Sequence, residues 1–261
     1  NELARLLEYV SPESADIVGS LGENTLGKVA VVTGGTGFLG SHLARKLGDL
    51  GHKVKVFDIN VPRSLTNATV NGITYYQGDV SQLSSDLRLE CDWCFHLAAL
   101  ADIIPSIKDP VAYHRVNVDG TVNLLSLCTR LGVKKFIYIS SCAVYGNPVK
   151  LPVGEDHPLN PLSPYAASKL SAESYCKAFS ESYGLKTTIL RLFNVYGPRQ
   201  SMSQYSGVIT EFIKRIRKGK PPVIFGDGEQ SRDFIFIEDA VKYIVSTVEN
   251  EMDGTFNIGS G

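Results

Sequence analysis

The chain has 261 residues, of which 43% are hydrophobic, and its 26 basic side chains nearly balance 27 acidic ones. A chain of this length can bury a large core without a disulfide or a metal, so we expect one main domain with a small lobe. The formal net charge of −1 provides no basic field for nucleic acid, and no apolar run approaches the roughly 20 residues that cross a membrane.

The segment before the first strand, residues 1–27, is predicted to be a helical extension. Leu3, Leu6, Leu7 and Val10 recur at helical spacing. The segment has neither the basic flank nor the apolar stretch of a secretion signal. Because the chain does not begin with Met, we expect the natural N-terminus to lie upstream.

Short apolar runs alternate with helical patterns from residue 28 onward. Runs that are apolar on both faces and separated by helices indicate an α/β fold, a doubly wound parallel sheet of the Rossmann type. The predicted strands are residues 28–33, 53–58, 73–76, 92–97, 134–140 and 186–193, and the predicted helices are residues 38–50, 111–131 and 163–183.

Beyond residue 194 the glycine and proline breakers are closely spaced and the elements are shorter. We interpret residues 28–193 as the main domain and residues 194–261 as a smaller C-terminal lobe, interleaved with the last sheet strands. The chain stops at a glycine turn after its last strand, so we expect this lobe to be incomplete. Its predicted elements are a helix at 208–218, strands at 222–225 and 234–237, a helix at 237–248 and a strand at 256–258.

The five cysteines are odd in number and lie in mostly apolar sequence, which favours a reducing compartment and hence the cytoplasm. Cys91 and Cys94 form a C-x-x-C, but no second pair or histidine couple accompanies them at the spacing of a zinc site. We therefore interpret both as strand-packing residues and predict no metal site.

A glycine-rich turn joins the first strand to the first helix. Gly34, Gly37 and Gly40 follow the strand, and Phe38 and Leu39 open the helix. Gly34 permits a tight turn, Gly37 lets the backbone approach a pyrophosphate, and Gly40 lets the helix pack close to the strand. Because the helix N-terminus then faces the phosphates, the main domain is predicted to bind a dinucleotide.

The ends of the next strands indicate which dinucleotide is bound. Asp58 ends the second strand, where a carboxylate accepts bonds from ribose hydroxyls and repels a 2′-phosphate, so the sequence favours NAD over NADP. His96, in an apolar strand, is predicted to be a hydrogen-bonded core histidine. Further cofactor contacts are predicted after the third and fourth strands, at Asp79, Val80, Leu97, Ala98 and Ala99.

Tyr165 and Lys169 are four residues apart in a predicted helix, so their side chains share one face. A nearby ammonium stabilises a phenolate, and we expect Lys169 to lower the pKa of Tyr165 enough for acid–base work. Ser141, at the carboxyl end of the fifth strand, can hydrogen-bond the same substrate oxygen.

Together these residues resemble an extended short-chain dehydrogenase/reductase of the nucleotide-sugar epimerase/dehydratase group. The resemblance covers residues 28–261 in order. It is carried by residues 33–40, Asp58, Asp79, 96–99, Asn117, 140–146, 165–169, 190–197 and Arg232 with Asp233.

The resemblance implies that Tyr165 is the base, that Ser141 assists it, and that Lys169 also binds the nicotinamide ribose. It places Asn117 and Phe193 near the cofactor. It implies a UDP-sugar substrate and a homodimer formed through the helices at 111–131 and 163–183, although those helices could equally face their own sheet. The implied substrate residues are Asn194 and Arg232 at the diphosphate, Val208 at the uridine, Arg199 more weakly, and Ser106 at the sugar. A simpler interpretation is that Arg232 pairs with Asp233.

The residues after Ser141 distinguish the reactions within the group. Dehydratases of the group carry Asp-Glu there, and UDP-glucuronate decarboxylases carry glutamate at the second position, whereas this chain has Cys142 and Ala143. With no extra acid or base, the resemblance implies NAD-dependent 4-epimerisation through a transient 4-keto sugar. A decarboxylase, a dehydratase, an NADP-dependent reductase and a non-catalytic NAD-binding protein remain alternatives, and the sugar stays open among glucose/galactose, N-acetylated and uronic forms.

Overall fold

The computed structural model describes residues 27–84, 87–200 and 207–261. The predicted N-terminal helix lies outside the described residues. Within them, none of the helices combines the length and the apolar character needed to cross a bilayer.

Most of the strands that the structure describes belong to one sheet, with the order β10-β7-β6-β5-β1-β2-β4-β3. All neighbouring pairs are parallel except β3 with β4. The sheet therefore has the predicted doubly wound, parallel character. Its strands are β1 (Val29–Thr33), β2 (Lys53–Asp58), β3 (Thr69–Val70), β4 (Ile73–Gln77), β5 (Trp93–His96), β6 (Lys135–Ser141), β7 (Thr187–Leu192) and β10 (Gly254–Ile258).

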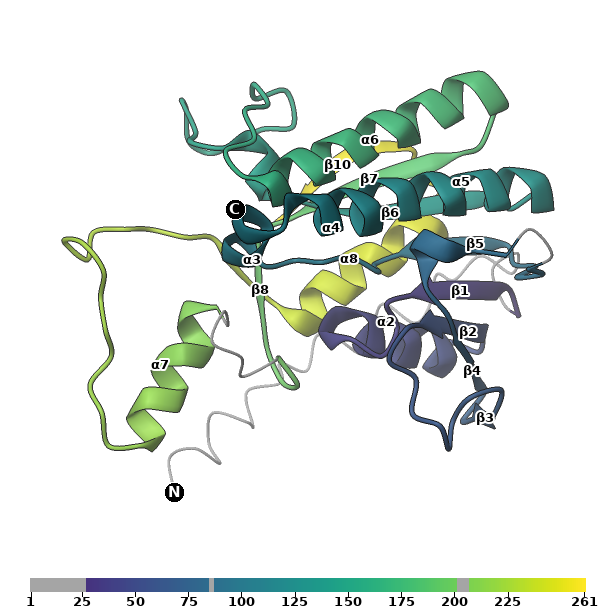
Figure 1. Cartoon of the computed structure of the whole chain (residues 1–261), viewed down its shortest axis with the longest axis horizontal. Coiled ribbons are helices and arrows are strands. Elements are labelled where there is room, and N and C mark those ends of the chain that lie inside the picture. The colour runs from purple at the N-terminus through teal and green to yellow at the C-terminus, as the bar shows by residue number, and fades with distance from the viewer. Residues whose placement is uncertain (1–26, 85–86, 201–206) are drawn as a thin grey trace.

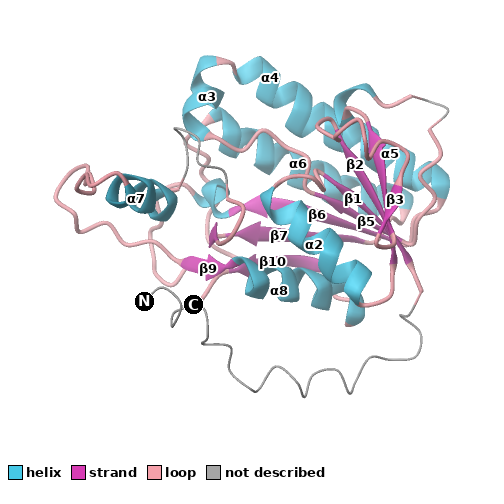
Figure 2. Ribbon diagram, turned by 90° about the horizontal axis from the view of Figure 1, so that it is seen from below, coloured by secondary structure: helices cyan, strands magenta, loops and turns pink. Residues whose placement is uncertain are grey.

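Helices cover both faces of this sheet (Figures 1 and 2). Helices α2 (Phe38–Asp49) and α8 (Ile237–Glu249) lie on one face. The opposite face carries α5 (Gly120–Leu131) and α6 (Pro164–Tyr183), together with the short helices α3 (Ile103–Lys108) and α4 (Pro110–His114).

The strands alternate between two hydrophobic clusters, one on each face. In β1, Ala30 and Val32 join the cluster under α2 and α8, whereas Val31 joins the cluster under α5 and α6. Successive side chains of a strand point to opposite faces, so a strand buried on both sides must be apolar throughout. This is the reason that a wholly apolar run predicted the central strand.

The helix predicted over residues 111–131 is interrupted. Helix α4 is followed by a π-helical segment, η3 (Arg115–Asp119), and only then by α5. Wide π turns are rare and are found mostly at functional sites. Here the wide turn holds Asn117, whose side chain is 1% exposed.

The segment beyond residue 193 divides between the sheet and a projection from it. Strand β10 extends the main sheet beside β7, and α8 packs against α2. Outside that sheet, β8 (Asn194–Tyr196) pairs in parallel with β9 (Phe234–Phe236). Helix α7 (Val208–Arg217) and the long connection that follows it stand away from the sheet (Figure 1).

Residues 222–225 were predicted as a strand, and the structure, which describes them, shows an irregular segment instead. They lie in the connection between α7 and β9, where Ile224 and Phe225 are 61% and 83% exposed. A strand requires a neighbouring strand to pair with its backbone, and apolar composition alone does not supply one.

Candidate active site

The glycine turn between β1 and α2 forms a close-fitting cradle. Gly34 has a φ of +68°, and a Cβ there would lie 2.7 Å from the backbone nitrogen of Ala98. A Cβ on Gly40 would lie 2.2 Å from the carbonyl oxygen of Gly34. Gly37 is the N-cap of α2, and no described side chain caps that end. The first N–H groups of α2 are therefore available to a phosphate.

Asp58 lies at the end of β2, beside this turn. Its carboxylate accepts hydrogen bonds from the backbone nitrogens of Thr36 (3.0 Å) and Asn60 (2.9 Å) and is 8% exposed. These bonds orient the carboxylate and tie the glycine turn to β2. A carboxylate oxygen has more than one lone pair, so it can still accept a bond from a ribose hydroxyl.

The other predicted cofactor residues lie at the ends of the neighbouring strands. Asp79 caps the short helix η2 (Val80–Gln82) by accepting bonds from the backbone and hydroxyl of Ser81, both at 2.8 Å. The backbone nitrogens of Leu97 and Ala98 each donate to the Thr33 hydroxyl at 3.2 Å. The carboxyl ends of β1, β2, β4 and β5 thus meet at one edge, as ligand sites of open parallel sheets do.

His96 is confirmed as a core histidine. Its ring nitrogens lie 2.7 Å from the Thr33 hydroxyl and 2.9 Å from the Thr121 hydroxyl. Burial, with a contribution from the charge of Lys169, lowers the pKa of His96 to about 3. The imidazole is therefore neutral at physiological pH, and both of its nitrogens form hydrogen bonds within the core.

The structure brings Ser141, Tyr165 and Lys169 together. Ser141 begins the short helix η4 (Cys142–Tyr145) as its N-cap, accepting a bond from the nitrogen of Ala143, and its hydroxyl is near enough to Tyr165 to act on the pKa of that phenol. Tyr165 and Lys169 are 9% and 4% exposed on the face of α6 that meets β6. The Lys169 ammonium donates to the carbonyl oxygen of Ile139 at 2.7 Å.

The expected lowering of the Tyr165 pKa was wrong for the structure as it stands. Burial raises the pKa of Tyr165 to about 12, and the nearby Ser141 hydroxyl only partly opposes this. Burial also lowers the pKa of Lys169 to about 8. Desolvation disfavours the charged form of each group, and it depends on burial, which cannot be seen in residue spacing.

Asn117 holds together the backbone around the site. Its amide oxygen accepts from the nitrogen of Leu100 at 2.8 Å, and its amide nitrogen donates to the Leu100 carbonyl and to the Ser168 hydroxyl, both at 2.9 Å. The π turn of η3 points this side chain at the loop after β5. Asn117 thereby links that loop to α6, beside Lys169.

A cavity of about 650 Å³ lies between the β8–β9 pair and α7. Three predicted substrate residues line it: Asn194, Val208 and Arg232. The Asn194 side chain donates to the carbonyl oxygen of Asp233 at 2.8 Å, which joins the two strands. Arg232 also lines this cavity and is exposed.

The simpler interpretation of Arg232, a pair with Asp233, is wrong. The Asp233 carboxylate accepts bonds from the nitrogens of Ser260 (2.8 Å) and Gly261 (3.2 Å). Among the ion pairs of the described residues, none joins Arg232 to Asp233. The terminal glycine turn therefore folds around Asp233, and the guanidinium of Arg232 remains exposed.

Two predicted substrate residues lie elsewhere. Arg199 lines a second cavity beside α2, with Arg45 and Asn60, and not the cavity of Arg232. Ser106 is fully buried, and its hydroxyl donates to the carbonyl oxygen of Ile103 at 2.5 Å. Neither geometry supports a sugar contact, so both residues are left out of the site proposed below.

Two residues near Tyr165 were missed by the sequence analysis. The Tyr113 ring meets the Tyr165 ring edge-on, with 6.4 Å between centroids, and its hydroxyl donates to the carbonyl oxygen of Asp102. The negative charge of the Asp102 carboxylate acts to raise the pKa of Tyr165. Asp102 precedes Ser106 by four residues in the chain, and nothing in the local pattern of Tyr113 distinguishes it from a core aromatic.

The profile of the family described as the NAD dependent epimerase/dehydratase family matches residues 30–259. The chain belongs to this family. The UDP-glucose 4-epimerase of Mycolicibacterium smegmatis is 35% identical over 242 residues, covering 88% of this chain and 77% of that protein. UDP-glucuronic acid decarboxylase 1 of Arabidopsis thaliana is 33% identical, covering 88% of this chain and 54% of that protein.

A solved structure shows the same fold for this member of the epimerase/dehydratase family. The UDP-N-acetylglucosamine 4-epimerase from Methanobrevibacter ruminantium, in complex with UDP-N-acetylmuramic acid, is 41% identical and superposes with a TM-score of 0.82. The match covers 90% of this chain and 77% of that one.

The cofactor of this epimerase/dehydratase family member is NAD. The turn fits a pyrophosphate, because Gly34 and Gly40 let the strand, the turn and the helix pack closely and no described side chain caps the N-terminus of α2. The Asp58 carboxylate fits the ribose, because it can accept a bond from a ribose hydroxyl. We expect the turn and Asp58 to hold the adenosine half, and Lys169 and Phe193 to lie at the nicotinamide half.

Proposed function

We propose that this protein catalyses the 4-epimerisation of a UDP-sugar with a bound NAD. Family membership supports a nucleotide-sugar reaction, and epimerases are among the similar proteins. The observation that carries the choice of epimerisation is the side-chain chemistry immediately after Ser141.

Cys142 and Ala143 occupy the positions that would need to carry an additional acid or base. Ala143 has no ionisable group. Burial raises the pKa of the Cys142 thiol, so the thiol is neutral at physiological pH. A 4-keto sugar formed beside these two side chains lacks a neighbouring carboxylic acid or base to assist loss of water or carbon dioxide, which favours its reduction back to the alcohol. Reduction on the opposite face inverts C4.

In the proposed reaction Tyr165 Oη takes the proton from the C4 hydroxyl and later returns it, while Ser141 Oγ hydrogen-bonds the same oxygen. Lys169 holds positive charge beside Tyr165. When bound, NAD supplies a reversible hydride acceptor and a positive nicotinamide ring that favours the tyrosinate. Burial of Tyr165 keeps solvent from competing for that proton.

The substrate is proposed to be held by its nucleotide. Arg232 presents a guanidinium, whose planar fork suits diphosphate oxygens, and Asn194 lies next to it. Val208, at the N-terminus of α7, is proposed to line the uridine pocket within the cavity of about 650 Å³. The sugar would then extend from Arg232 towards Tyr165.

The test is to incubate the protein, without added NAD, separately with UDP-glucose, UDP-N-acetylglucosamine and UDP-glucuronate. We expect a C4-inverted product from one of them, with no net NADH. Tyr165→Phe should lower kcat by roughly 10²–10⁴-fold while NAD remains bound. A requirement for stoichiometric NAD with accumulating NADH would contradict the epimerase proposal.

Decarboxylation is the second candidate, because a UDP-glucuronic acid decarboxylase is 33% identical. The incubation with UDP-glucuronate separates the two reactions: an epimerase gives UDP-galacturonate, and a decarboxylase releases carbon dioxide and a pentose. The lack of a carboxylic acid at Cys142 and Ala143 predicts the first outcome.

We also propose a homodimer and a cytoplasmic location. Helices α5 and α6 use one face on their own sheet, and the outer face of α6 exposes Tyr175 and Tyr183 at 44% and 63%. The cysteines of the described chain are unpaired, which suits a reducing compartment. Light scattering during size-exclusion chromatography would give twice the chain mass if the dimer forms.

A further inference from the structure

Helix α6 carries a third buried polar residue on the face that holds Tyr165 and Lys169. Glu173 lies four residues after Lys169, so the three side chains form one stripe along the helix. Glu173 is 1% exposed. A carboxylate is almost never buried so completely unless it is paired, and nothing in the proposed reaction uses it.

The stripe is bonded to three consecutive residues at the end of β6. The Ile139 carbonyl accepts from Lys169 at 2.7 Å, and the Ser140 hydroxyl donates to Glu173 at 2.6 Å. Ser141, the next residue, lies near enough to Tyr165 for its hydroxyl to act on the pKa of the phenol. The Glu173 bond therefore holds Ser140, the residue before Ser141, against α6, the helix that carries Tyr165.

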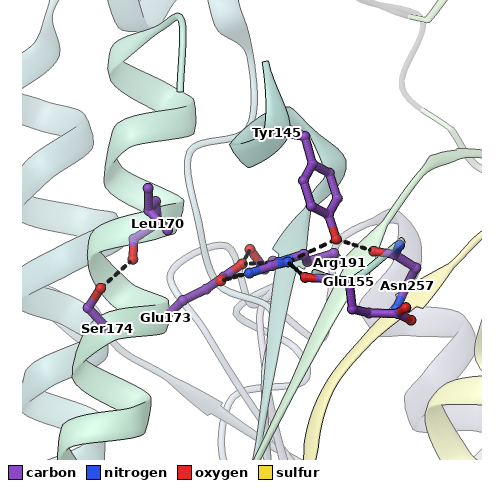
Figure 3. Close-up of polar contacts among 8 residues, drawn as sticks. Tyr145, Glu155, Leu170, Glu173, Ser174, Arg191 and Asn257 are labelled. Atoms are coloured by element: carbon purple, nitrogen blue, oxygen red, sulfur yellow. Dashed lines mark hydrogen bonds and ion pairs between the residues drawn. The ribbon is translucent and has the colours of Figure 1, made fainter. Parts of the chain in front are cut away.

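Arg191 of β7 neutralises Glu173 through a two-pronged ion pair. Its Nη2 lies 2.7 Å from Oε2 of Glu173 and its Nε lies 3.0 Å from Oε1. The Arg191 side chain is 2% exposed. On its other side Nη1 donates to the Tyr145 hydroxyl at 2.8 Å, and that hydroxyl donates to Asn257 at 2.6 Å. Figure 3 shows Arg191 between Glu173 and Tyr145.

The pair also sets the charge around Lys169. Burial lowers the pKa of Lys169 to about 8, and the Glu173 carboxylate acts in the opposite direction. Without Glu173 the lysine would lose its proton at lower pH. The titratable and charged groups that face Lys169 are Tyr165, Glu173 and Cys176 on α6, Tyr138 on β6, His96 on β5 and, behind Glu173, Arg191 on β7.

We infer that Glu173 is a positioning residue for Tyr165 and Lys169. Its carboxylate, held by Arg191, keeps the end of β6 in register with the stripe on α6 and places a negative charge one turn beyond the lysine. The inference rests on the proposed function for its catalytic meaning, but the charge on Lys169 can be measured without any substrate.

The first measurement follows the Lys169 side chain in protein labelled with carbon-13 at the lysine ε position. The Lys169 signal is the one missing from Lys169→Met. We expect its titration midpoint to move to lower pH in Glu173→Gln, because the variant loses a negative charge and leaves Arg191 unpaired. Glu173→Asp retains the charge and should leave the midpoint close to that of the wild type.

The second measurement is the pH profile of turnover. In Glu173→Gln, kcat should fall with little change in KM, and the decline on the alkaline side should begin at lower pH. A purely structural role would lower activity equally at every pH. Glu181→Gln, the same change on the exposed end of α6, serves as the control and should alter neither midpoint nor profile.

A buried unpaired arginine could prevent folding of the single variant, so Glu173→Gln with Arg191→Met provides the second route. Replacing both members of a buried ion pair is often tolerated. Its Lys169 midpoint should still lie below that of the wild type, because the nearer charge has been removed. An unchanged Lys169 midpoint in Glu173→Gln, or in the double variant if the single one does not fold, would overturn the inference. A shifted midpoint in a protein that turns over no UDP-sugar would uphold it and reject the proposed function.

Discussion

The hydroxyl of Thr33 lies 2.7 Å from Nδ1 of His96, and this contact joins the ends of β1 and β5 directly beneath the glycine turn. Thr33 accepts bonds from the nitrogens of Leu97 and Ala98, so its own proton goes to His96. Thr121 donates to the carbonyl oxygen of Asn117, so it accepts from Nε2 of His96. The network thus requires a neutral imidazole with its proton on Nε2.

This requirement predicts a pH-dependent stability. The pKa of His96 falls from 6.5 to about 3 on folding, so its contribution is complete above pH 6.5 and is lost as the pH falls towards 3. Between pH 6.5 and pH 5 the loss should be roughly 1–2 kcal/mol. His96→Asn should be less stable at neutral pH and should lack this part of the slope in urea unfolding. His114→Asn, which changes an exposed histidine outside this network, serves as the comparison variant.

The close packing around Gly40 predicts that a side chain added there would weaken cofactor binding. A Cβ there would lie 2.2 Å from the carbonyl oxygen of Gly34, so Gly40→Ala must displace the turn. We expect a loss of about 1–3 kcal/mol in stability and a marked loss of NAD affinity by calorimetry. Gly48→Ala on the same helix meets nothing closer than 3.8 Å and should stabilise the protein by about 0.5–1 kcal/mol. Equal NAD affinity in both variants would contradict the cradle.

The Asp58 carboxylate is predicted to make the protein prefer NAD to NADP. Asp58→Asn removes the charge that repels a 2′-phosphate while retaining an oxygen for the ribose, so the ratio of NAD to NADP affinity should fall by about tenfold or more. Asp49→Asn changes the same charge at an exposed position of α2 and should leave the ratio unchanged. Competition binding of the two dinucleotides would measure both, and an unchanged ratio in Asp58→Asn would show that another group selects NAD.

The exposed guanidinium of Arg232 is predicted to contribute to the affinity for UDP. Replacing it with glutamine removes a charged hydrogen-bond donor worth about 1.5–3 kcal/mol, a roughly tenfold to hundredfold loss in UDP binding. NAD binding should not change. Arg217→Gln, at an exposed position of α7, controls for the loss of positive charge on the lobe. If both variants bind UDP as the wild type does, the diphosphate lies elsewhere.

Much of the main domain could be predicted because its signals are local. The strand ends at Thr33 and Asp58 follow from apolar runs, and the pairing of Tyr165 with Lys169 follows from helical spacing. The segment at 222–225 was mispredicted because a strand needs a partner that local pattern does not reveal. Helix α4 and the π turn of η3 were merged with α5 because the switch from α to π hydrogen bonding is not encoded in residue types.

The sequence by itself determined the glycine cradle, the preference for NAD and the set of Ser141, Tyr165 and Lys169, since each depends on residue type and short spacing. Only the tertiary structure decided the ionisation of that set, because burial raises the pKa of Tyr165 and lowers that of Lys169. It alone paired Glu173 with Arg191, which are 18 residues apart on a helix and a strand. Desolvation and long-range pairing arise from packing, and packing exists only once the chain has folded.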